Sequence, residues 1–390
     1  MKISKIFIGG WFQRTTLHLS EIWDFLNEQK SELDIPNDKL KQAARNLNLK
    51  NVTRENGTLE YILAQTTNGV DFRIYEDGLT ILEKESSGDS KDFEDIKKYY
   101  DERLSPAISL IFSKGAPVPK ELANIKTILP YIVVSRDGAE DTIKKFFEGH
   151  GEEIYSAVST QNVGVYKSPT FILINNLKKE ELIRGIVESQ IFFREFKTQL
   201  HRYLNIHRTI WEKIAAIKEQ GAIKGTQIAP LRNELSDYQK TISLIDARIK
   251  QMGSYVRTRQ KVTDIKQVDE YLNPLFQLKF ETLQDTHEYI NHLWGMTKSY
   301  LDSTIGMFNE LQAQSTKTSL SSLQLITTIG VVSGIIGYLG KDKLPSFTGI
   351  GLIYFGILLV ITWAINNAIS ALYKNKKYPV KSSDIIKNIK

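Results

Sequence analysis

Two long apolar runs near the C-terminus dominate the pattern of hydrophobic and polar positions along the chain. The first covers Leu320–Leu339 and the second Ile350–Leu372, with a short polar segment between them. Each run has about 20 residues, and at about 1.5 Å rise per residue a helix of that length matches the ~30 Å hydrocarbon core of a bilayer. The pattern predicts transmembrane helices over 320–339 and 350–373, joined by an outer loop over 340–349.

The first run is less apolar than the second, because serine, threonine and glycine residues interrupt it. Small and polar residues in a spanning helix face protein or a water-filled path, since lipid cannot satisfy their hydrogen bonds. Two interpretations therefore stay open. The run either lines an aqueous path or packs closely against another helix through small residues such as Gly330 and Gly334.

Short strand-like and helix-like segments alternate in residues 1–177, which predicts an α+β domain with a mixed sheet. Asn68-Gly69 and Asp77-Gly78 lie between apolar stretches, and such dipeptides are typical of antiparallel hairpins. The expected strands cover 3–8, 59–64, 70–75, 80–83, 131–135, 154–158 and 170–174, and the expected helices cover 21–30, 37–46, 93–103 and 140–147.

From residue 178 the apolar positions adopt the spacing of three and four that is typical of coiled coils. Residues 178–262 hold two such helices, and Gly221 and Gly225 between them indicate an antiparallel pair. A third apolar stripe, in the stalk segment 263–319, continues after Pro274 toward Leu320 without a break. The prediction is one very long stalk helix that runs directly into the first transmembrane helix.

Charge and composition add orientation and exclude several functions. The 390 residues contain 51 Lys and Arg against 45 Asp and Glu, a net charge of +6, and no cysteine. The absence of cysteine excludes disulfides, thiolate metal sites and cysteine nucleophiles. Lysines concentrate in the tail 374–390, so the positive-inside rule places both termini in the cytoplasm of a multi-pass inner-membrane protein. This distribution accounts for the positive charge without nucleic-acid binding, and the N-terminus has no signal-peptide pattern.

No conventional catalytic or metal motif is present, so we expect a protein that is not an enzyme. His287 and His292 lie five residues apart, whereas a zinc-protease helix requires a spacing of four. His287 also falls on the apolar stripe, which favours a packed histidine. Phosphate-binding and nucleophile-elbow motifs are missing from the sequence.

One edge of the first long helix is basic. It has two interpretations: a solvated helix face with salt bridges, or a site for an anion or phosphate, completed by Arg232 or Arg248. Trp11 and Arg14, after a Gly-Gly turn, either join such a site or, in the case of Trp11, lie in the core. The candidate ligand-binding residues are Arg194, Lys197, His201, Arg202 and Arg208.

One face of the first apolar run and its approach combines threonine, leucine and glycine. In a ring of identical helices this face would line a narrow path, with leucine side chains as dewetting gates and hydroxyls and carbonyls as polar steps. The candidate pore-lining residues are Thr316, Leu320, Leu323, Thr327, Gly330, Gly334, Gly337 and Tyr338.

This organisation resembles the CorA family of magnesium channels along nearly the whole chain. The resemblance implies a cytoplasmic α/β domain, a long stalk helix that lines a pore, and a homopentamer. The family closes its first span with Gly-Met-Asn, whereas this chain has Gly337, Tyr338 and Leu339 there. The following loop carries Lys341 and Lys343 where the family tends to be acidic, which puts magnesium selectivity in doubt.

The opening MKISKIFIGGWFQRTTLH looks like a subgroup of CorA-like membrane proteins encoded beside type III CRISPR systems. That resemblance implies an antiviral effector, gated by a nucleotide-derived second messenger. The expected partners are further copies of the chain, the bilayer and a small anionic ligand, and not nucleic acid. Two alternatives remain: a divalent-cation transporter that binds Mg²⁺ with a divergent filter, and a membrane-anchored scaffold that does not conduct.

Overall fold

A computed structural model describes residues 1–12, 18–115, 128–136 and 138–339, isolated positions between 353 and 371, and residues 375–380. The chain forms two compact units, Met1–Asn205 with Leu244–Leu293 and Ile206–Ser243 with Trp294–Lys390. The long helices belong to both units.

The first unit contains a mixed sheet of nine strands within the described residues, in the order β2-β3-β4-β5-β1-β6-β9-β8-β7. Its neighbours are antiparallel except for the parallel pair β6 and β9. The strands are β1 (Ile3–Trp11), β2 (Leu49–Asn56), β3 (Glu60–Thr66), β4 (Val70–Tyr75), β5 (Leu79–Glu85), β6 (Tyr131–Ser135), β7 (Ser156–Ser159), β8 (Gly164–Lys167) and β9 (Phe171–Asn175).

Short helices cover one face of this sheet and enclose the main hydrophobic core. Strand side chains alternate between faces, so Ile6, Ile8 and Phe72 point into this core while their neighbours point to the other face. The covering helices are α1 (Leu19–Trp23), the π-helix η1 (Asp24–Glu28), α2 (Asn37–Asn46), α3 (Lys91–Tyr99), the π-helix η2 (Tyr100–Leu104), α4 (Ser105–Gly115) and α5 (Glu140–Gly149).

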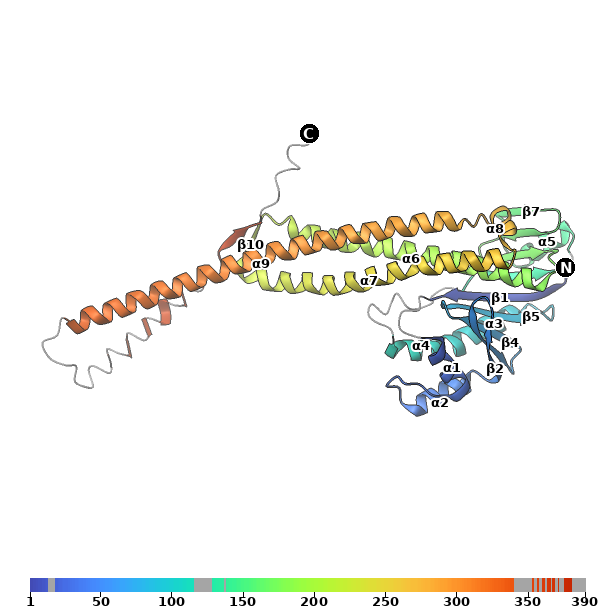
Figure 1. The fold of residues 1–390 in the computed structure, drawn as a ribbon, viewed down its shortest axis with the longest axis horizontal. Helices are drawn as coiled ribbons and strands as arrows, with labels where there is room; N and C mark the ends of the chain where they lie inside the picture. The colour runs from blue at the N-terminus through green and yellow to red at the C-terminus, as the bar shows by residue number, and fades with distance from the viewer. Residues whose placement is uncertain are drawn as a thin grey trace, which may run out of the picture. The chain divides into compact units, whose positions relative to one another are not determined.

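The other face of the sheet packs against the first part of α6 (Glu180–Lys218) and the last part of α7 (Gly225–Ile265), as Figure 1 shows. The ring of Trp11 contacts Phe192 and Phe196 of α6 at centroid distances of 5.8 and 5.4 Å. Gly9 allows this close approach, because a Cβ there would lie 2.9 Å from a methyl carbon of Ile191. The mixed sheet followed by long helices confirms this part of the predicted fold class.

After α8 (Asp269–Phe276), a single helix, α9, runs from Phe280 to Leu339 (Figure 1). A break at Gln277, whose φ is +57°, separates it from α8. Buried residues follow the apolar stripe from Phe280 as far as Leu311. The described helices include none long and apolar enough to span a membrane. The predicted second transmembrane helix over 350–373 and the loop over 340–349 lie largely outside the described residues.

In the second unit, the chain returns after the second apolar run to the turn between α6 and α7. Strand β11 (Lys377–Pro379) pairs with β10 (Ala222–Lys224), with Tyr378 opposite Ile223. Both of these side chains are buried. Two further backbone hydrogen bonds, from Gly225 N to Lys376 O and from Val380 N to Gly221 O, extend the pairing. Residues 376–380, which follow the second run, are therefore held at the end of the helical pair.

Candidate functional site

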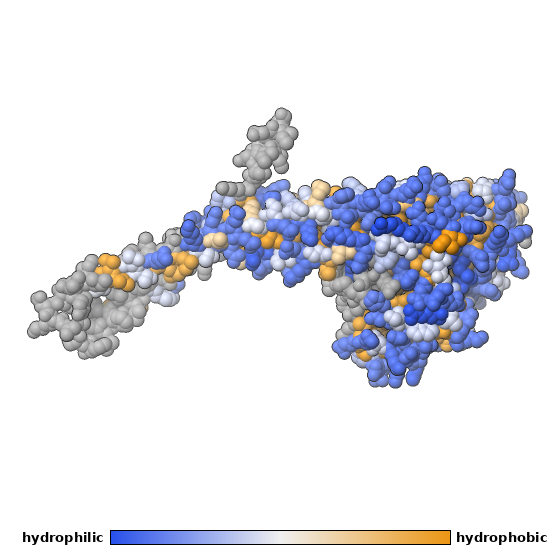
Figure 2. Space-filling view, viewed as in Figure 1, coloured by the Kyte–Doolittle hydropathy of each residue, from blue (hydrophilic) through white to orange (hydrophobic). Residues whose placement is uncertain are grey.

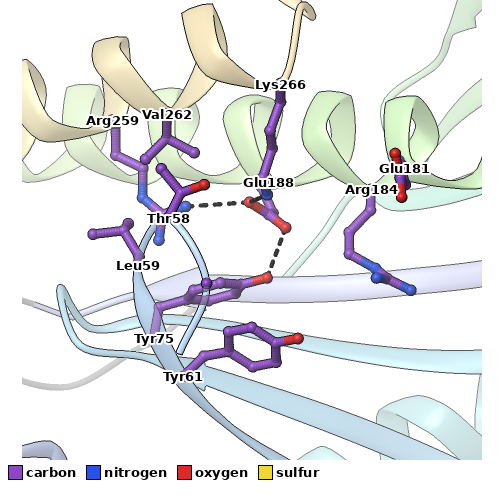
Figure 3. Close-up of a pocket in the computed structure, with 11 residues that line it drawn as sticks. Thr58, Leu59, Tyr61, Tyr75, Glu181, Arg184, Glu188, Arg259, Val262 and Lys266 are labelled. Carbon is purple, nitrogen blue, oxygen red and sulfur yellow. Dashed lines mark hydrogen bonds and ion pairs between the residues drawn. The ribbon is translucent and has the colours of Figure 1, made fainter. Parts of the chain in front are cut away.

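A charged pocket opens on the sheet face that α6 and α7 cover (Figure 3). Its volume is about 250 Å³, slightly below the range of roughly 300 to 1,000 Å³ that is typical of small-molecule sites. The lining comes from the β2–β3 turn, strands β3 and β4, and the two helices: Gly57, Thr58, Leu59, Tyr61, Tyr75, Glu181, Arg184, Glu188, Arg259, Val262 and Lys266.

Regular secondary structure explains why these residues meet. Tyr61 of β3 and Tyr75 of β4 are directly opposite each other in the antiparallel register, and their ring centroids lie 5.1 Å apart. On α6, Arg184 and Glu188 are four residues apart and share a helical face. The pocket is therefore built on strands and helices, which hold side chains more rigidly than loops do.

Glu188 is the centre of the hydrogen-bond network in the pocket. It is buried, and its carboxylate accepts hydrogen bonds from the Tyr75 hydroxyl (2.6 Å) and the Lys266 ammonium (2.7 Å) and a longer one from Arg259 (3.4 Å). Burial raises the pKa of the Tyr75 hydroxyl far above its ordinary value, and the negative charge of Glu188 raises it further. Tyr75 therefore stays protonated and donates a hydrogen bond to Glu188 at physiological pH.

Arg259 completes the network from α7. Its guanidinium makes two hydrogen bonds to the Asp77 carboxylate, at 2.5 and 2.7 Å, and lies 4.8 Å from the centre of the Tyr75 ring. Both members of the pair are almost fully buried. Burial by itself would lower the pKa of Arg259, but Asp77 and Glu188 outweigh it and raise that pKa. The pair joins the turn after β4 to α7.

Arg184 differs from the other cations of the pocket. It is half-buried, yet no hydrogen bond or ion pair joins its guanidinium to another residue in the described part of the chain. Figure 3 shows it extending from α6 toward the strands, away from Glu181. Beside it, the Tyr61 hydroxyl donates to Glu55 at 2.5 Å, so the polar end of Tyr61 is bound while its ring lines the pocket. Burial and Glu55 both raise the pKa of Tyr61.

The chemistry of the pocket favours an anion over a metal ion. Three cations line it against two carboxylates, and Glu188 already accepts from three donors. Among the described residues, no group of three or more His, Cys, Asp and Glu side chains is placed to hold a metal ion. A pocket with a partnerless guanidinium and an aromatic wall is suited to a negatively charged ligand.

The structure does not gather the basic residues of α6 into one pocket. Arg194 is mostly buried and serves the fold, because its guanidinium donates to Glu195 (2.9 Å) and to the Gly9 carbonyl (2.8 Å). Arg202 makes a long hydrogen bond to Gln199, at 3.4 Å. The other three candidates, Lys197, His201 and Arg208, are exposed, and Arg208 belongs to the second unit.

The two arginines that were expected to complete a site at this basic edge belong to different units. Arg232 donates to Asn309 at 2.8 Å in the second unit, whereas Arg248 is buried in the first unit. Arg14 lies outside the described residues. Trp11 is a core residue, since it is 5% exposed and its indole N–H donates to the Asp77 carbonyl at 2.8 Å.

The candidate pore-lining residues lie on the last part of α9. Where the structure describes their side chains, as at Thr316, Leu320, Leu323 and Thr327, they are exposed in the single chain, and Gly330 and Gly334 share that exposure. The Thr327 hydroxyl donates to the Leu323 carbonyl at 2.8 Å. The side chain of Tyr338, and the surroundings of Gly337, lie outside the description.

His287 is a packing residue between α7 and α9. It is buried, and its Nε2 lies within hydrogen-bond distance of the Ile249 carbonyl, so that nitrogen carries the proton. Its ring also lies against Gly253 of α7, where a Cβ would come within 2.9 Å of it. This agrees with the interpretation of His287 as a packed histidine.

Sequence reasoning did not find the pocket, because its residues come from segments that are far apart in the chain. A weak signal was nevertheless present. Glu181, Arg184 and Glu188 follow one helical face of α6, and Lys266, the first residue after α7, follows Arg259 by seven positions. Charged residues at the spacing of one helical face, beside an apolar stripe, indicate a helix face that packs against polar groups.

Comparisons with known proteins do not place the chain in a family. No family model matches it, and no curated protein does. A solved structure of the CorA magnesium transporter from Methanocaldococcus jannaschii is similar to it with a TM-score of 0.25 and 12% identity, covering 63% of this chain and 91% of that chain. Similarity this low decides neither fold nor function.

Proposed function

We propose that the chain forms a homo-oligomeric channel of the cytoplasmic membrane, in which the last part of α9 lines an ion path and a small anionic ligand opens it. The expected assembly is a pentamer. The observation that carries the proposal is the path of the chain in the second unit, which leaves the helical pair along α9 and returns to it at β11.

The register between α7 and α9 locates the two ends of this excursion. Gln239 donates to Asp302 and Arg232 donates to Asn309, so seven residues along α7 correspond to seven along α9 in the opposite direction. The same register sets Gly225, at the start of α7, opposite Thr316. Gly225 N donates a hydrogen bond to Lys376 O, so Lys376 lies beside the same residue of α7 as Thr316. The segment between Thr316 and Lys376 therefore leaves the helical pair and returns to it at the same height along α7.

The length of this segment suits a membrane hairpin. The part of α9 from Leu320 to Leu339 is about 30 Å long, and an α-helix made of the second apolar run would be about 35 Å long. Large apolar side chains of α9 are exposed in the single chain: Leu320 by 55%, Leu323 by 47% and Val331 by 56%. In Figure 2, apolar surface is visible along this part of α9. Lipid or further copies of the chain would cover it.

Ligand gating is the finer part of the proposal. The pocket with the partnerless Arg184 supports an anionic ligand, and the resemblance to membrane effectors encoded beside type III CRISPR systems suggests a nucleotide-derived messenger. A ligand that binds the open state more tightly than the closed state shifts the population toward conduction by the ratio of the two affinities. Opening would dissipate ion gradients and arrest the cell.

The test is ion flux through liposomes that contain the purified full chain, together with its mass in detergent. Leu323→Thr should raise basal flux, because a polar side chain removes a dewetting ring from the path. Val332→Thr is the matched control, since it lies about 180° from Leu323 around α9 and should leave basal flux unchanged.

Each alternative has its own outcome in this experiment. Flux of Mg²⁺ that no anionic ligand changes would favour a divalent-cation transporter with a divergent filter. A monomer, or an oligomer without flux in the parent chain and in Leu323→Thr, would contradict the channel and favour a scaffold.

A further inference from the structure

Arg184 is half-buried and has no hydrogen-bond or ion-pair partner among the described residues. Half-buried guanidinium groups are normally paired, because a cation that is partly removed from water loses hydration that only an anion or hydrogen-bond acceptors replace. Every other cation that lines the pocket has a carboxylate partner: Asp77 and Glu188 for Arg259, and Glu188 for Lys266. Arg184 has no such partner among the described residues and projects into the same space (Figure 3).

Beside Arg184, the pocket has an aromatic wall. The Tyr61 and Tyr75 rings contact each other at an interplanar angle of 39°. The Tyr75 ring is fixed by its hydrogen bond to Glu188 and by Arg259 over one face. Tyr61 is held at its hydroxyl by Glu55 and is only partly buried, so its ring remains available to a ligand.

We propose that this pocket binds a small aromatic anion, a planar ring that carries a phosphate or a carboxylate. The ring packs against Tyr61, and the anionic group accepts hydrogen bonds from the Arg184 guanidinium and the Lys266 ammonium. Lys266 is 28% exposed and can reach the ligand without losing Glu188. The volume of about 250 Å³ accommodates one ring system with one charged group and excludes a dinucleotide.

The charges of the pocket select against other ligands. A cationic ligand would be repelled by Arg184 and Lys266, and the Glu188 carboxylate already accepts hydrogen bonds from three donors. A neutral aromatic would leave Arg184 without a partner. An inorganic anion would leave the ring of Tyr61 uncovered. Only a molecule with both an aromatic ring and an anionic group packs against Tyr61 and pairs with Arg184.

Occupancy would have a consequence beyond the pocket. The ligand would touch the β2–β3 turn, α6 and α7 together, and both helices continue from this unit into the second one. This consequence, the gating of a channel, rests on the proposed function. The binding itself does not, because it depends on residues of the first unit alone.

Isothermal titration of the detergent-purified full chain tests the ligand class. The probes are AMP and phenyl phosphate as aromatic phosphates, phenylacetate as an aromatic carboxylate, and adenosine and inorganic phosphate as the separate halves. We expect an aromatic anion to bind at least about tenfold more tightly than either half, because each half uses one wall only. If no aromatic anion of the set bound more tightly than adenosine or phosphate, the proposal would be wrong.

Variants test the location. Arg184→Gln should weaken binding of the best probe roughly 10- to 100-fold, the usual effect of losing a charge-assisted pair of hydrogen bonds. Tyr61→Leu should weaken it roughly three- to tenfold through lost ring contact. The controls are Arg208→Gln on the exposed face of α6 and Tyr155→Leu, a tyrosine 67% exposed and outside the pocket. Both controls should bind as the parent chain does.

The opposite pattern would overturn the proposal. If Arg208→Gln or Lys197→Gln abolished binding while Arg184→Gln left it intact, the ligand would occupy the exposed basic edge of α6. Arg184→Gln breaks no described hydrogen bond or ion pair, so its melting temperature should match that of the parent chain. Flux through liposomes, measured separately with the same probe, distinguishes failure of the pocket from failure of the channel.

Discussion

At the residue scale, the buried pair of Asp77 and Arg259 has the largest expected effect on stability. Asp77→Asn removes the charge that two hydrogen bonds of Arg259 require, so a buried guanidinium keeps only its long contact to Glu188. Breaking one side of a buried pair costs about 3 to 5 kcal/mol. Denaturant unfolding of the full chain should show a loss of this order in the free energy of unfolding.

The control for that loss is an exposed pair. Lys97 and Asp101 are one helical turn apart and nearly half exposed, so Lys97→Ala should change the free energy of unfolding by less than about 0.5 kcal/mol. An equal effect of Asp77→Asn and Lys97→Ala would mean that the Asp77–Arg259 pair contributes nothing.

Glu83 gives the stability a defined dependence on pH. Burial raises its pKa, but hydrogen bonds from Lys5 and Arg73 outweigh this and lower it below the ordinary value. The unfolded chain then binds a proton more readily than the folded chain. The stability from Glu83 is therefore fully present above a pH of about 4.3, the ordinary value, and is lost as the pH falls through the lowered pKa.

Melting temperatures measured against pH check this sign. Glu83→Gln should lower the melting temperature at neutral pH and flatten its decline in acid, whereas the exposed Glu148→Gln should leave the curve unchanged. A parallel curve for Glu83→Gln, with the same acid slope as the parent chain, would contradict the assignment.

At the scale of elements, sequence periodicity predicted the long helices because the spacing of their buried apolar residues repeats over many helical turns. In α7, Ile242, Ile249 and Val256 recur every seven residues, as the spacing of a coiled coil requires, and all three are fully buried. Helix α2 and strand β4 also have the predicted bounds. The hairpins marked by Asn68-Gly69 and Asp77-Gly78 form as predicted, with positive φ at both glycines.

Other elements could not be recognised from local pattern. Strand β2 is an edge strand, and its polar sequence has no clear strand pattern. Its backbone pairing with β3 holds it in the extended conformation. Strand β8 has only four residues, too few to show alternation. The pocket was missed for a related reason, since Tyr61, Arg184 and Lys266 meet only through tertiary packing.

The strand pair β10 and β11 is an element whose stability one side chain controls. Ile223→Ala removes the fully buried residue of β10 and should free the tail, because loss of such a side chain costs about 2 to 5 kcal/mol. Hydrogen exchange at the Val380 amide, which donates to Gly221, should accelerate roughly tenfold or more.

The exposed neighbour on the same strand provides the control. Lys224→Ala keeps the buried contact and should leave exchange at Val380 unchanged. If exchange at Val380 were no faster in Ile223→Ala than in Lys224→Ala, the buried side chain of Ile223 would not be what holds this strand pair.

At the scale of the whole molecule, the absence of cysteine makes the proposed topology directly testable. Glu153→Cys marks an exposed position of the first unit, and Asp342→Cys marks the segment between the two apolar runs. In sealed vesicles of defined orientation, an impermeant maleimide should label the two positions from opposite sides. The return of the chain to β11 requires this result if both runs span the membrane.

Labelling of both positions from the same side would remove the membrane hairpin and the proposed channel with it. The cysteine-free parent chain is the control for background labelling.

The outer strands of the sheet bear on how the protein is made. Strand β2 carries Lys50, Arg54 and Glu55, and β7 at the opposite edge is only four residues long. Charges and short length keep sheet edges from pairing with other chains. The ribosome completes the sheet long before the apolar C-terminal runs emerge, and N-terminal units fold first. If the apolar runs enter a membrane as proposed, these edges protect the nascent chain from aggregation during the interval before they do so.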